Sequence, residues 1–194
     1  GQLYTQYSLY KNYNVILEDV LKYNTTIAEK HDIGALAGYN QQYFKLYNFT
    51  TRKTGLLDES LTTLNTATNM TSISGDAYDF ALRSFFGRLN YAYNQRYLFE
   101  AVFRYDGSSR FSKDSRWGFF PAFSGGWRIS EEPFMKNFSK YIDNLKLRAS
   151  WGKTGNNASG NYDYQATYNT TQYSFNGVAS NGLIQKKSAN PNLK

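Results

Sequence analysis

The sequence predicts an all-β protein, and more specifically a segment of about six antiparallel strands from a transmembrane β-barrel with long extracellular loops. Aromatic residues make up 18% of the 194 residues and charged residues only 19%. Apolar or aromatic side chains recur at every second position in several segments, and short and long connections alternate between these segments. Successive side chains of a strand point to opposite faces, so each segment has one apolar face and one polar face.

The first two expected strands form a hairpin. In residues 15–27 the odd positions are mostly apolar or aromatic, and Asp19 interrupts them, so this strand begins beyond Asp19 or bulges there. The alternation resumes in residues 33–39, after the short polar break 28–32. A short break between two such runs indicates a hairpin. His31 lies in this break and is expected to be a solvated turn residue.

The next pair of strands follows a long polar stretch. Residues 48–80 show no sustained period and are expected to form a long loop. The segment 83–93 then alternates cleanly and leads through "YNQR" into 97–105, which predicts a tight hairpin. The odd positions of the second segment carry only aromatic or small apolar side chains, namely Tyr97, Phe99, Ala101, Phe103 and Tyr105.

Two further strands are expected at 119–129 and 145–151. Pro121 cannot donate a ladder hydrogen bond, which places it near a strand start or a bulge. Residues 131–144 connect the two strands and are expected to contain a short helical turn. The polar segment 153–194 is expected to be a second long loop.

Two observations favour a membrane barrel. The short and medium connections 28–32, 93–96 and 131–144 fall on one side of the sheet and the longer ones on the other, as in outer-membrane barrels. Aromatic side chains also gather near the strand ends, where barrels carry interfacial girdles: Tyr93, Tyr97, Tyr105, Phe119, Trp127 and Trp151. The charged even positions suit a water-filled lumen and the open face of a soluble sheet equally well. A secreted, soluble β-sandwich that binds glycans therefore stays open as an alternative.

Composition argues against several other functions. The chain has no cysteine and one histidine, which argues against thiolate chemistry, metal sites and histidine-dependent catalysis. The adjacent carboxylates at 58–59 and 131–132 lie in expected turns and lack glycosidase geometry. The net charge of +7 is spread over the chain without a recognised nucleic-acid module. We therefore expect no enzyme, no cofactor, no metal site and no nucleic-acid partner.

The sequence also resembles a known family. The runs that carry the resemblance are "FFGRLNYAYNQRYLFEAVFRYDGSSRFSKDSRWGFFPAFSGGWRISEEPFMKN", "LKLRASWGKTGNN" and the earlier "YNTTIAEKHDIGALAGYNQ". Together they closely resemble the barrel of SusC/RagA-type TonB-linked outer-membrane transporters, and the final "NPNLK" is similar to the start of their next strand. The resemblance covers Tyr13 to about Asn157 well and the long loops poorly.

The resemblance implies a large barrel of about 22 strands that is filled by an N-terminal plug. It implies import of oligosaccharides or peptides across the Gram-negative outer membrane, with energy delivered by the TonB system through the plug and with a SusD-like surface lipoprotein as partner. Residues 1–194 are then expected to be one internal part of that barrel, without the plug and the remaining strands. A TonB-dependent siderophore receptor is the alternative within the same membrane.

Five residues are candidates for substrate contact, in the lumen or in the loops: Arg104, Asp106, Arg110, Arg116 and Trp117. The first three belong to "RYDGSSRF", where Asp and Gly also favour a turn and the arginines could simply pair with lumen carboxylates. Trp117 could stack on a sugar at the barrel mouth or belong to an interfacial girdle. The loops 48–80 and 153–194 are expected to contact substrate or lipoprotein, because loops on a rigid scaffold often carry recognition.

Overall fold

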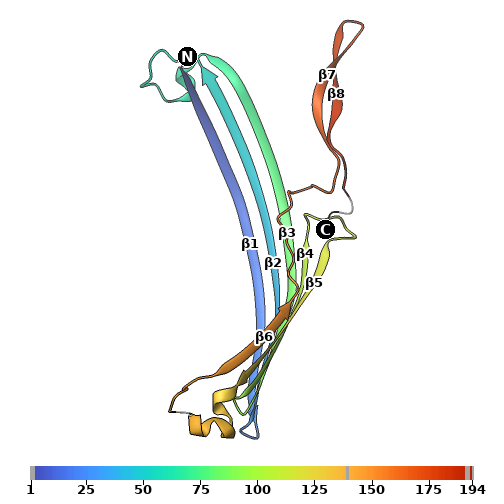
Figure 1. Ribbon diagram of the computed structural model, residues 1–194. Helices are drawn as coiled ribbons and strands as arrows, with labels where there is room; N and C mark the ends of the chain where they lie inside the picture. Colours follow the sequence, from blue (N-terminus) through green and yellow to red (C-terminus); the bar gives the residue numbers. More distant parts are fainter. Residues whose placement is uncertain (1–2, 139, 191–192, 194) are drawn as a thin grey trace. The chain divides into compact units, whose positions relative to one another are not determined.

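The structure is a computed structural model that describes residues 3–138, 140–190 and 193 (Figure 1). Six strands form one sheet in chain order: β1 (Tyr4–Ile27), β2 (His31–Thr54), β3 (Asn69–Tyr93), β4 (Tyr97–Ser108), β5 (Trp117–Arg128) and β6 (Lys146–Gly152). A separate two-stranded sheet contains β7 (Thr167–Phe175) and β8 (Val178–Lys187). The prediction of an all-β antiparallel segment of about six strands is confirmed.

The strands of the first half are longer than predicted. The loop expected at 48–80 covers only residues 55–68, because β2 runs to Thr54 and β3 begins at Asn69. The expected loop 153–194 contains the hairpin β7–β8. The further strand expected at 190–194 lies partly outside the described residues, and Asn190 and Leu193 are not in a strand.

Two compact units are distinguished, residues 1–16 with 42–81 and residues 17–41 with 82–194. In the first unit the loop 55–68 is bonded to the start of β1. The Gly55 N–H donates to the Leu3 carbonyl at 3.2 Å, and the Thr5 hydroxyl donates to the Thr62 carbonyl at 2.8 Å. Because loop backbone needs hydrogen-bond partners, these contacts give the loop a defined conformation.

In the second unit, tight turns join β1 to β2 and β3 to β4. Ala28, Glu29, Asn94 and Gln95 all have positive φ, between 47° and 56°. Two consecutive residues of this conformation match the right-handed twist of a hairpin. The Asn94 N–H donates to the Lys30 carbonyl at 2.7 Å, so the two turns are neighbours at one end of the sheet.

The connection between β5 and β6 lies at the same end. It contains two short 3₁₀ helices, η2 (Ile129–Glu131) and η3 (Pro133–Phe138), which confirms the expected helical turn. The Arg128 N–H donates to the carbonyl of Arg96 in the β3–β4 turn at 2.8 Å. The predicted placement of these three connections on one side is therefore confirmed. No helix among the described residues is long and apolar enough to cross a membrane.

The strand register keeps the two faces of the sheet distinct. Phe99 pairs with Gly125 and Glu100 with Ser124, so odd positions share one face and even positions share the other, here named the odd face and the even face. The register of β3–β4 and β5–β6 has the same parity. The alternation read from the sequence thus continues across neighbouring strands as two continuous surfaces.

The odd face is apolar and exposed. Phe99 is 45% exposed and Trp151 64%. Only three apolar side chains are buried among the described residues, namely Ala67, Ala101 and Phe111. A soluble sandwich would bury this face between two sheets, so the exposed aromatic surface argues against the sandwich alternative and agrees with a face that meets lipid.

Aromatic side chains on the odd face of the second unit form two rows. The rim row lies at the turn end and consists of His31, Tyr93, Tyr97 and Trp127, with neighbouring ring centroids 5.0 to 6.4 Å apart. The loop-end row consists of Tyr39, Phe85, Tyr105 and Trp117, with neighbouring centroids 4.8 to 6.3 Å apart. Along β4 the rows are separated by about 26 Å at the usual rise of a strand, which is the scale of the apolar band of an outer-membrane barrel.

The expectation for His31 is wrong. This residue begins β2 and is half-buried, and its Nδ1 atom lies 2.8 Å from the Tyr91 hydroxyl oxygen. The β1–β2 turn is only three residues long, so the strand starts two positions earlier than the polar sequence suggests. His31 is therefore part of the rim row.

Candidate functional site

The even face holds most of the candidate functional groups. Its polar side chains alternate with the aromatic side chains of the odd face, so they form a continuous polar surface over β3–β6. Two concave regions lie along this surface within the second unit. One lies near the loops that follow β4 and β6, and the other lies near the tight turns.

The first region, here named the loop-end pocket, has a volume of about 730 Å³. Its lining includes Arg104, Asp106, Arg116 and Trp117, which are four of the five predicted contact residues, together with Phe120. It also includes residues of the segment 153–157 that follows β6. Residues of β2 to β5 and of two loops therefore contribute to one pocket.

Arg104 and Asp106 are paired with each other. They occupy successive even positions of β4, and the guanidinium donates two hydrogen bonds to the carboxylate, at 3.1 and 3.2 Å. The Arg104 guanidinium also lies 5.8 Å from the centroid of the Phe86 ring. The side chains remain 51% and 32% exposed, so this pair presents polar atoms to the pocket. The pairing of an arginine with a carboxylate was one of the two interpretations of this motif.

Arg110 contacts the loop that follows β6. Its Nε atom donates to the side-chain oxygen of Asn161 at 3.0 Å, and a terminal nitrogen donates to the Asn157 carbonyl at 3.1 Å. At the start of this loop, the Lys153 N–H donates to the Pro121 carbonyl at 2.9 Å. Gly155 packs against the ring of Phe120, where an added Cβ would lie only 2.3 Å from the ring. Arg110 thus positions the loop rather than lining the pocket.

Arg116 offers a polar group without a partner. Its Nε atom is buried and has no hydrogen-bond partner in the part of the chain that the structure describes. Its backbone carbonyl accepts a hydrogen bond from the Ser108 N–H at 3.1 Å, which fixes the base of the loop between β4 and β5. A buried N–H group without a partner is costly, so a ligand oxygen at this position would be stabilised.

Trp117 is placed on the opposite face from the Arg104–Asp106 pair. Its ring stacks on Tyr105, with centroids 4.8 Å apart and an angle of 12° between the planes. It also covers Gly107, where an added Cβ would lie 2.8 Å from the indole. Trp117 therefore borders the loop-end pocket, but its ring lies on the odd face, whereas Arg104 and Asp106 occupy even positions. This placement favours the girdle interpretation of Trp117.

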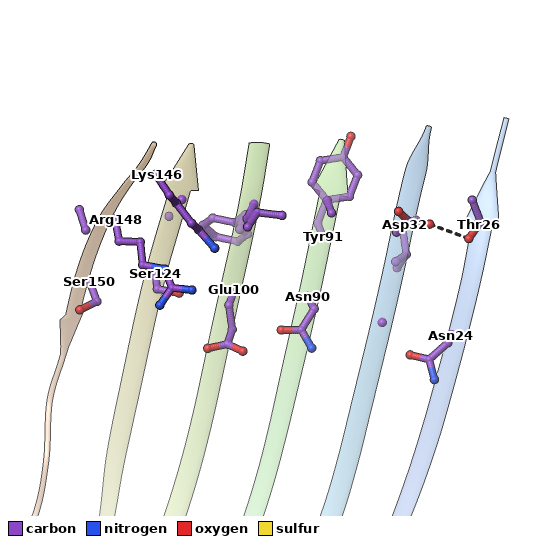
Figure 2. A pocket seen from close by; sticks show the side chains of 18 of the residues that line it. Asn24, Thr26, Asp32, Asn90, Tyr91, Glu100, Ser124, Lys146, Arg148 and Ser150 are labelled. Carbon is purple, nitrogen blue, oxygen red and sulfur yellow. Dashed lines mark hydrogen bonds between the residues drawn. The ribbon is translucent and has the colours of Figure 1, made fainter. Parts of the chain in front are cut away.

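The second region, here named the rim pocket, has a volume of about 920 Å³ and is shown in Figure 2. Its lining includes Glu100, Lys146 and Arg148. Lys146 and Arg148 extend from β6 over β5 (Figure 2), and the Lys146 side chain passes within 3.2 Å of the position that a Cβ on Gly126 would take. The absence of a side chain at Gly126 makes room for this crossing.

Asp32 marks the other side of the rim pocket. Its carboxylate accepts a hydrogen bond from the Thr26 hydroxyl at 2.6 Å and another from the Gln95 side-chain amide. The sequence pattern places Glu100, Lys146 and Arg148 at mid-strand even positions, but it does not indicate that they line one pocket. The signal for this pocket in the sequence is that its polar residues share even positions: 24, 32, 90, 100, 124 and 146.

Both pockets can bind a polar ligand. They offer hydroxyl, amide, carboxylate and guanidinium groups to a polar ligand. No cluster of three or more potential metal-ligating His, Cys, Asp or Glu side chains occurs among the described residues. One apolar face and one polar, concave face on the same strands are the features of a barrel wall.

Comparison with known proteins agrees with this architecture. Residues 1–194 match the sequence model of the family described as "TonB dependent receptor-like, beta-barrel". The chain belongs to this family. TonB-dependent receptor SusC from Bacteroides thetaiotaomicron is 35% identical over 195 residues, covering 98% of this chain and 18% of SusC. TonB-dependent receptor P26 from Formosa agariphila is 37% identical over 180 residues, covering 91% of this chain and 18% of P26.

Solved structures show the same fold. The RagAB peptide importer in its "closed-closed" state matches with a TM-score of 0.86 and 26% identity, covering 97% of this chain and 21% of that chain. The "open-open" state of the same importer also matches with a TM-score of 0.86. The chain spans about a fifth of the length of these relatives. The resemblance to the SusC/RagA type is therefore confirmed for the barrel segment.

Proposed function

We propose that this chain is part of the barrel of a TonB-dependent transporter in the outer membrane of a Gram-negative bacterium. The transporter imports oligosaccharides or other oligomeric nutrients, including peptides, and does not act as an enzyme. The observation that carries this proposal is the two-faced sheet of a TonB-dependent receptor barrel, with exposed aromatic side chains on one face and polar pockets on the other. The resemblance to SusC and to the RagAB peptide importer supports the nutrient class.

The proposal includes further parts that act with residues 1–194. Among the described residues, the outer strands β1 and β6 have one neighbour each in the sheet. Open strand edges are not stable within a membrane, so further strands must complete the barrel. A plug domain that connects the barrel to TonB and a SusD-like surface lipoprotein complete the proposed transporter.

Within this transporter, we assign substrate contact to the loop-end pocket. Arg104 and Asp106 present an exposed ion pair, and Arg116 presents an N–H group without a partner among the described residues. Arg110 acts as a positioning residue, because it holds the loop 153–166 beside this pocket. Alternating donors and acceptors of this kind suit the hydroxyl groups of sugars and the amide groups of peptides.

Uptake measurements in the bacterium that encodes the parent protein test the proposal. Cells with and without its gene are given fluorescent malto-oligosaccharides, fluorescent casein-derived peptides, or ferrichrome. Deletion is expected to abolish uptake of one oligomer class and to leave growth on glucose and free amino acids unchanged. Inactivation of TonB should have the same effect. Unchanged uptake of both oligomer classes contradicts the proposal, and a selective loss of ferrichrome uptake assigns the siderophore alternative.

The lipoprotein partner is tested separately. The parent protein, tagged at one terminus, is purified from native outer membranes in mild detergent. A SusD-like lipoprotein is expected to co-purify in a stoichiometric amount. Purification of the transporter alone, from membranes in which such a lipoprotein is detected, contradicts this part of the proposal.

A further inference from the structure

The connector between β5 and β6, residues 129–145, carries large apolar side chains that contact little of the protein. Phe134 is 60% exposed, Phe138 55% and Tyr141 80%. Within the described part of this segment, the N–H groups of Tyr141 and Ile142 both donate to the Phe138 carbonyl, at 2.9 and 3.0 Å. Figure 1 shows this coiled segment at the turn end of β5 and β6. Exposed aromatic side chains on an ordered segment indicate an interaction surface.

The connector is attached to the odd face through Glu132. This side chain is only 8% exposed. Its carboxylate accepts hydrogen bonds from the Tyr97 hydroxyl at 2.6 Å, the Trp127 indole N–H at 3.0 Å and the Arg96 guanidinium at 3.4 Å. These three donors come from the β3–β4 turn, β4 and β5. A charged group with three donors from separate segments fixes the position of the connector.

This attachment places the connector beside the rim row. Tyr97 and Trp127 both belong to that row, and their rings stack with centroids 6.4 Å apart. Tyr93 continues the row on the next strand, 6.3 Å from Tyr97. Tyrosine and tryptophan gather where a barrel leaves the hydrocarbon and enters the headgroup region. The apolar side chains of the connector therefore begin at the level of the membrane interface.

The charges of the connector fit the same location. Lys136 and Lys140 alternate with its aromatic residues, and the acidic residues of the segment besides Glu132 are Glu131 and Asp143 near its two ends. A mixture of lysine and bulky apolar side chains is typical of segments that lie in the plane of a membrane interface. Lysine stems pack against apolar surface while their ammonium groups reach phosphate oxygens.

We propose that residues 133–138 and 140–142 form an interfacial anchor that lies among the phospholipid headgroups at the turn end of the barrel. Phe134, Phe138 and Tyr141 insert between lipids, and Lys136 and Lys140 face the lipid phosphates. Glu132 is the positioning residue that holds this anchor against the rim row. The inference rests on the proposed membrane location of the barrel, but it adds a lipid contact outside the strands.

Site-directed spin labelling of the full-length parent protein tests the anchor. Single cysteines replace Phe134 and Phe138, carry a nitroxide, and are studied in vesicles of phosphatidylethanolamine and phosphatidylglycerol. Phe103→Cys on the odd face is the lipid control, and Lys113→Cys in the loop after β4 is the aqueous control. The ratio of collisions with oxygen to collisions with a water-soluble nickel chelate is expected to be several-fold higher at 134 and 138 than at 113.

The controls separate the two hypotheses. If the collision ratio at position 103 indicates lipid while the ratios at positions 134 and 138 equal that at position 113, the anchor is wrong and the barrel proposal stands. If 103 also matches 113, the proposed membrane location fails and the anchor fails with it. Positions 134 and 138 could also be exposed to water in vesicles and become protected only when another membrane protein is added. That result would assign the surface to a protein partner and would also overturn the lipid anchor.

Glu132→Ala tests the positioning role. In the Phe134→Cys background, Glu132→Ala is expected to lower the collision ratio toward the aqueous value. The same substitution in the Phe103→Cys background shows, by an unchanged ratio, that the barrel remains inserted. Glu131→Ala, at the neighbouring exposed carboxylate, is the matched control and should leave the ratio unchanged. Equal ratios for both variants would show that Glu132 does not hold the anchor.

Discussion

The indole N–H of Trp127 donates a hydrogen bond of 3.0 Å to the carboxylate of Glu132, five residues further along the chain. The same carboxylate accepts a hydrogen bond from the Tyr97 hydroxyl, so one acidic side chain joins the start of β4, the end of β5 and the connector. The hydrogen bonds from Tyr97 and Trp127, with a smaller contribution from the Arg96 charge, hold the pKa of Glu132 below its usual 4.5. The connection therefore depends on an ionised carboxylate.

This dependence predicts an acid-sensitive step in stability. A carboxyl group whose pKa is lower in the folded state stabilises that state fully above its unfolded pKa, and the stabilisation disappears as the pH falls through the folded pKa. We expect the thermal stability of the full-length protein to fall in this range below pH 4.5. Glu132→Gln should flatten that part of the curve, as followed by heat-dependent gel mobility. An unchanged pH profile in this variant would contradict the role of Glu132.

Arg110 is predicted to hold the loop 153–166 in place. Arg110→Ala removes the contacts to Asn157 and Asn161, so faster amide hydrogen exchange is expected across that loop. Lys113→Ala, in the same β4–β5 connection, is the control and should not change the exchange. The variant is also expected to lower uptake without lowering surface abundance. Equal losses of uptake and abundance would point to a folding defect instead.

Arg116 is predicted to contact substrate directly. A hydrogen bond to a charged group contributes about 1.5 kcal/mol or more, so Arg116→Ala should weaken the apparent affinity for the imported oligomer by roughly tenfold. Transport is measured over a range of substrate concentrations, with surface abundance determined in parallel. An affinity equal to that of the unmodified protein would remove Arg116 from the contact site.

We predict that one substitution in the β1–β2 turn increases the stability of the barrel. Ala28 has a φ of 50°, a conformation that is unfavourable for residues with a Cβ. Ala28→Gly should therefore stabilise the barrel by about 1 kcal/mol. Ala35→Gly, within β2, is the matched control and should destabilise by roughly 0.5–1 kcal/mol. The midpoint of thermal unfolding in detergent distinguishes the two effects, and a lower midpoint for Ala28→Gly would contradict the prediction.

The hairpin β3–β4 could be predicted because its local and tertiary preferences agree. Within its two strands, every odd position from Phe85 to Tyr105 carries an aromatic, an aliphatic or a small residue, and Asn94 in the turn tolerates positive φ. The β7–β8 hairpin had an equally clear signal in Asn176-Gly177, the preferred pair for such a turn. Its largely polar strands concealed this signal.

The strands of the first unit could not be recognised from alternation alone. Lys11 and Lys45 occupy odd positions, where an apolar side chain would be expected. In the structure their ammonium groups lie over tyrosine rings, Lys11 over Tyr13 at 5.1 Å and Lys45 over Tyr47 at 4.9 Å. Each of these tyrosines lies two residues further along the same strand, on the same face as its lysine, so it accommodates a charge that breaks the apolar pattern.

The candidate site was predictable to the extent that it follows strand parity. Arg104 and Asp106 share a face because they are two residues apart on β4. The contact of Arg110 with Asn161 joins positions 51 residues apart, which no local pattern indicates. The placement of Trp117 with Tyr105 likewise depends on the register of β4 and β5. Long-range pairing therefore decided which candidates lie together.

The central claim is that the odd face meets lipid and the even face meets water. Single cysteines in the full-length protein at Phe99 and Phe103, and at Glu100 and Arg104, test it most directly in intact outer membranes. A water-soluble maleimide is expected to label positions 100 and 104 and not 99 and 103. Equal labelling of all four positions, or recovery of the protein only in the soluble fraction, would contradict the membrane barrel.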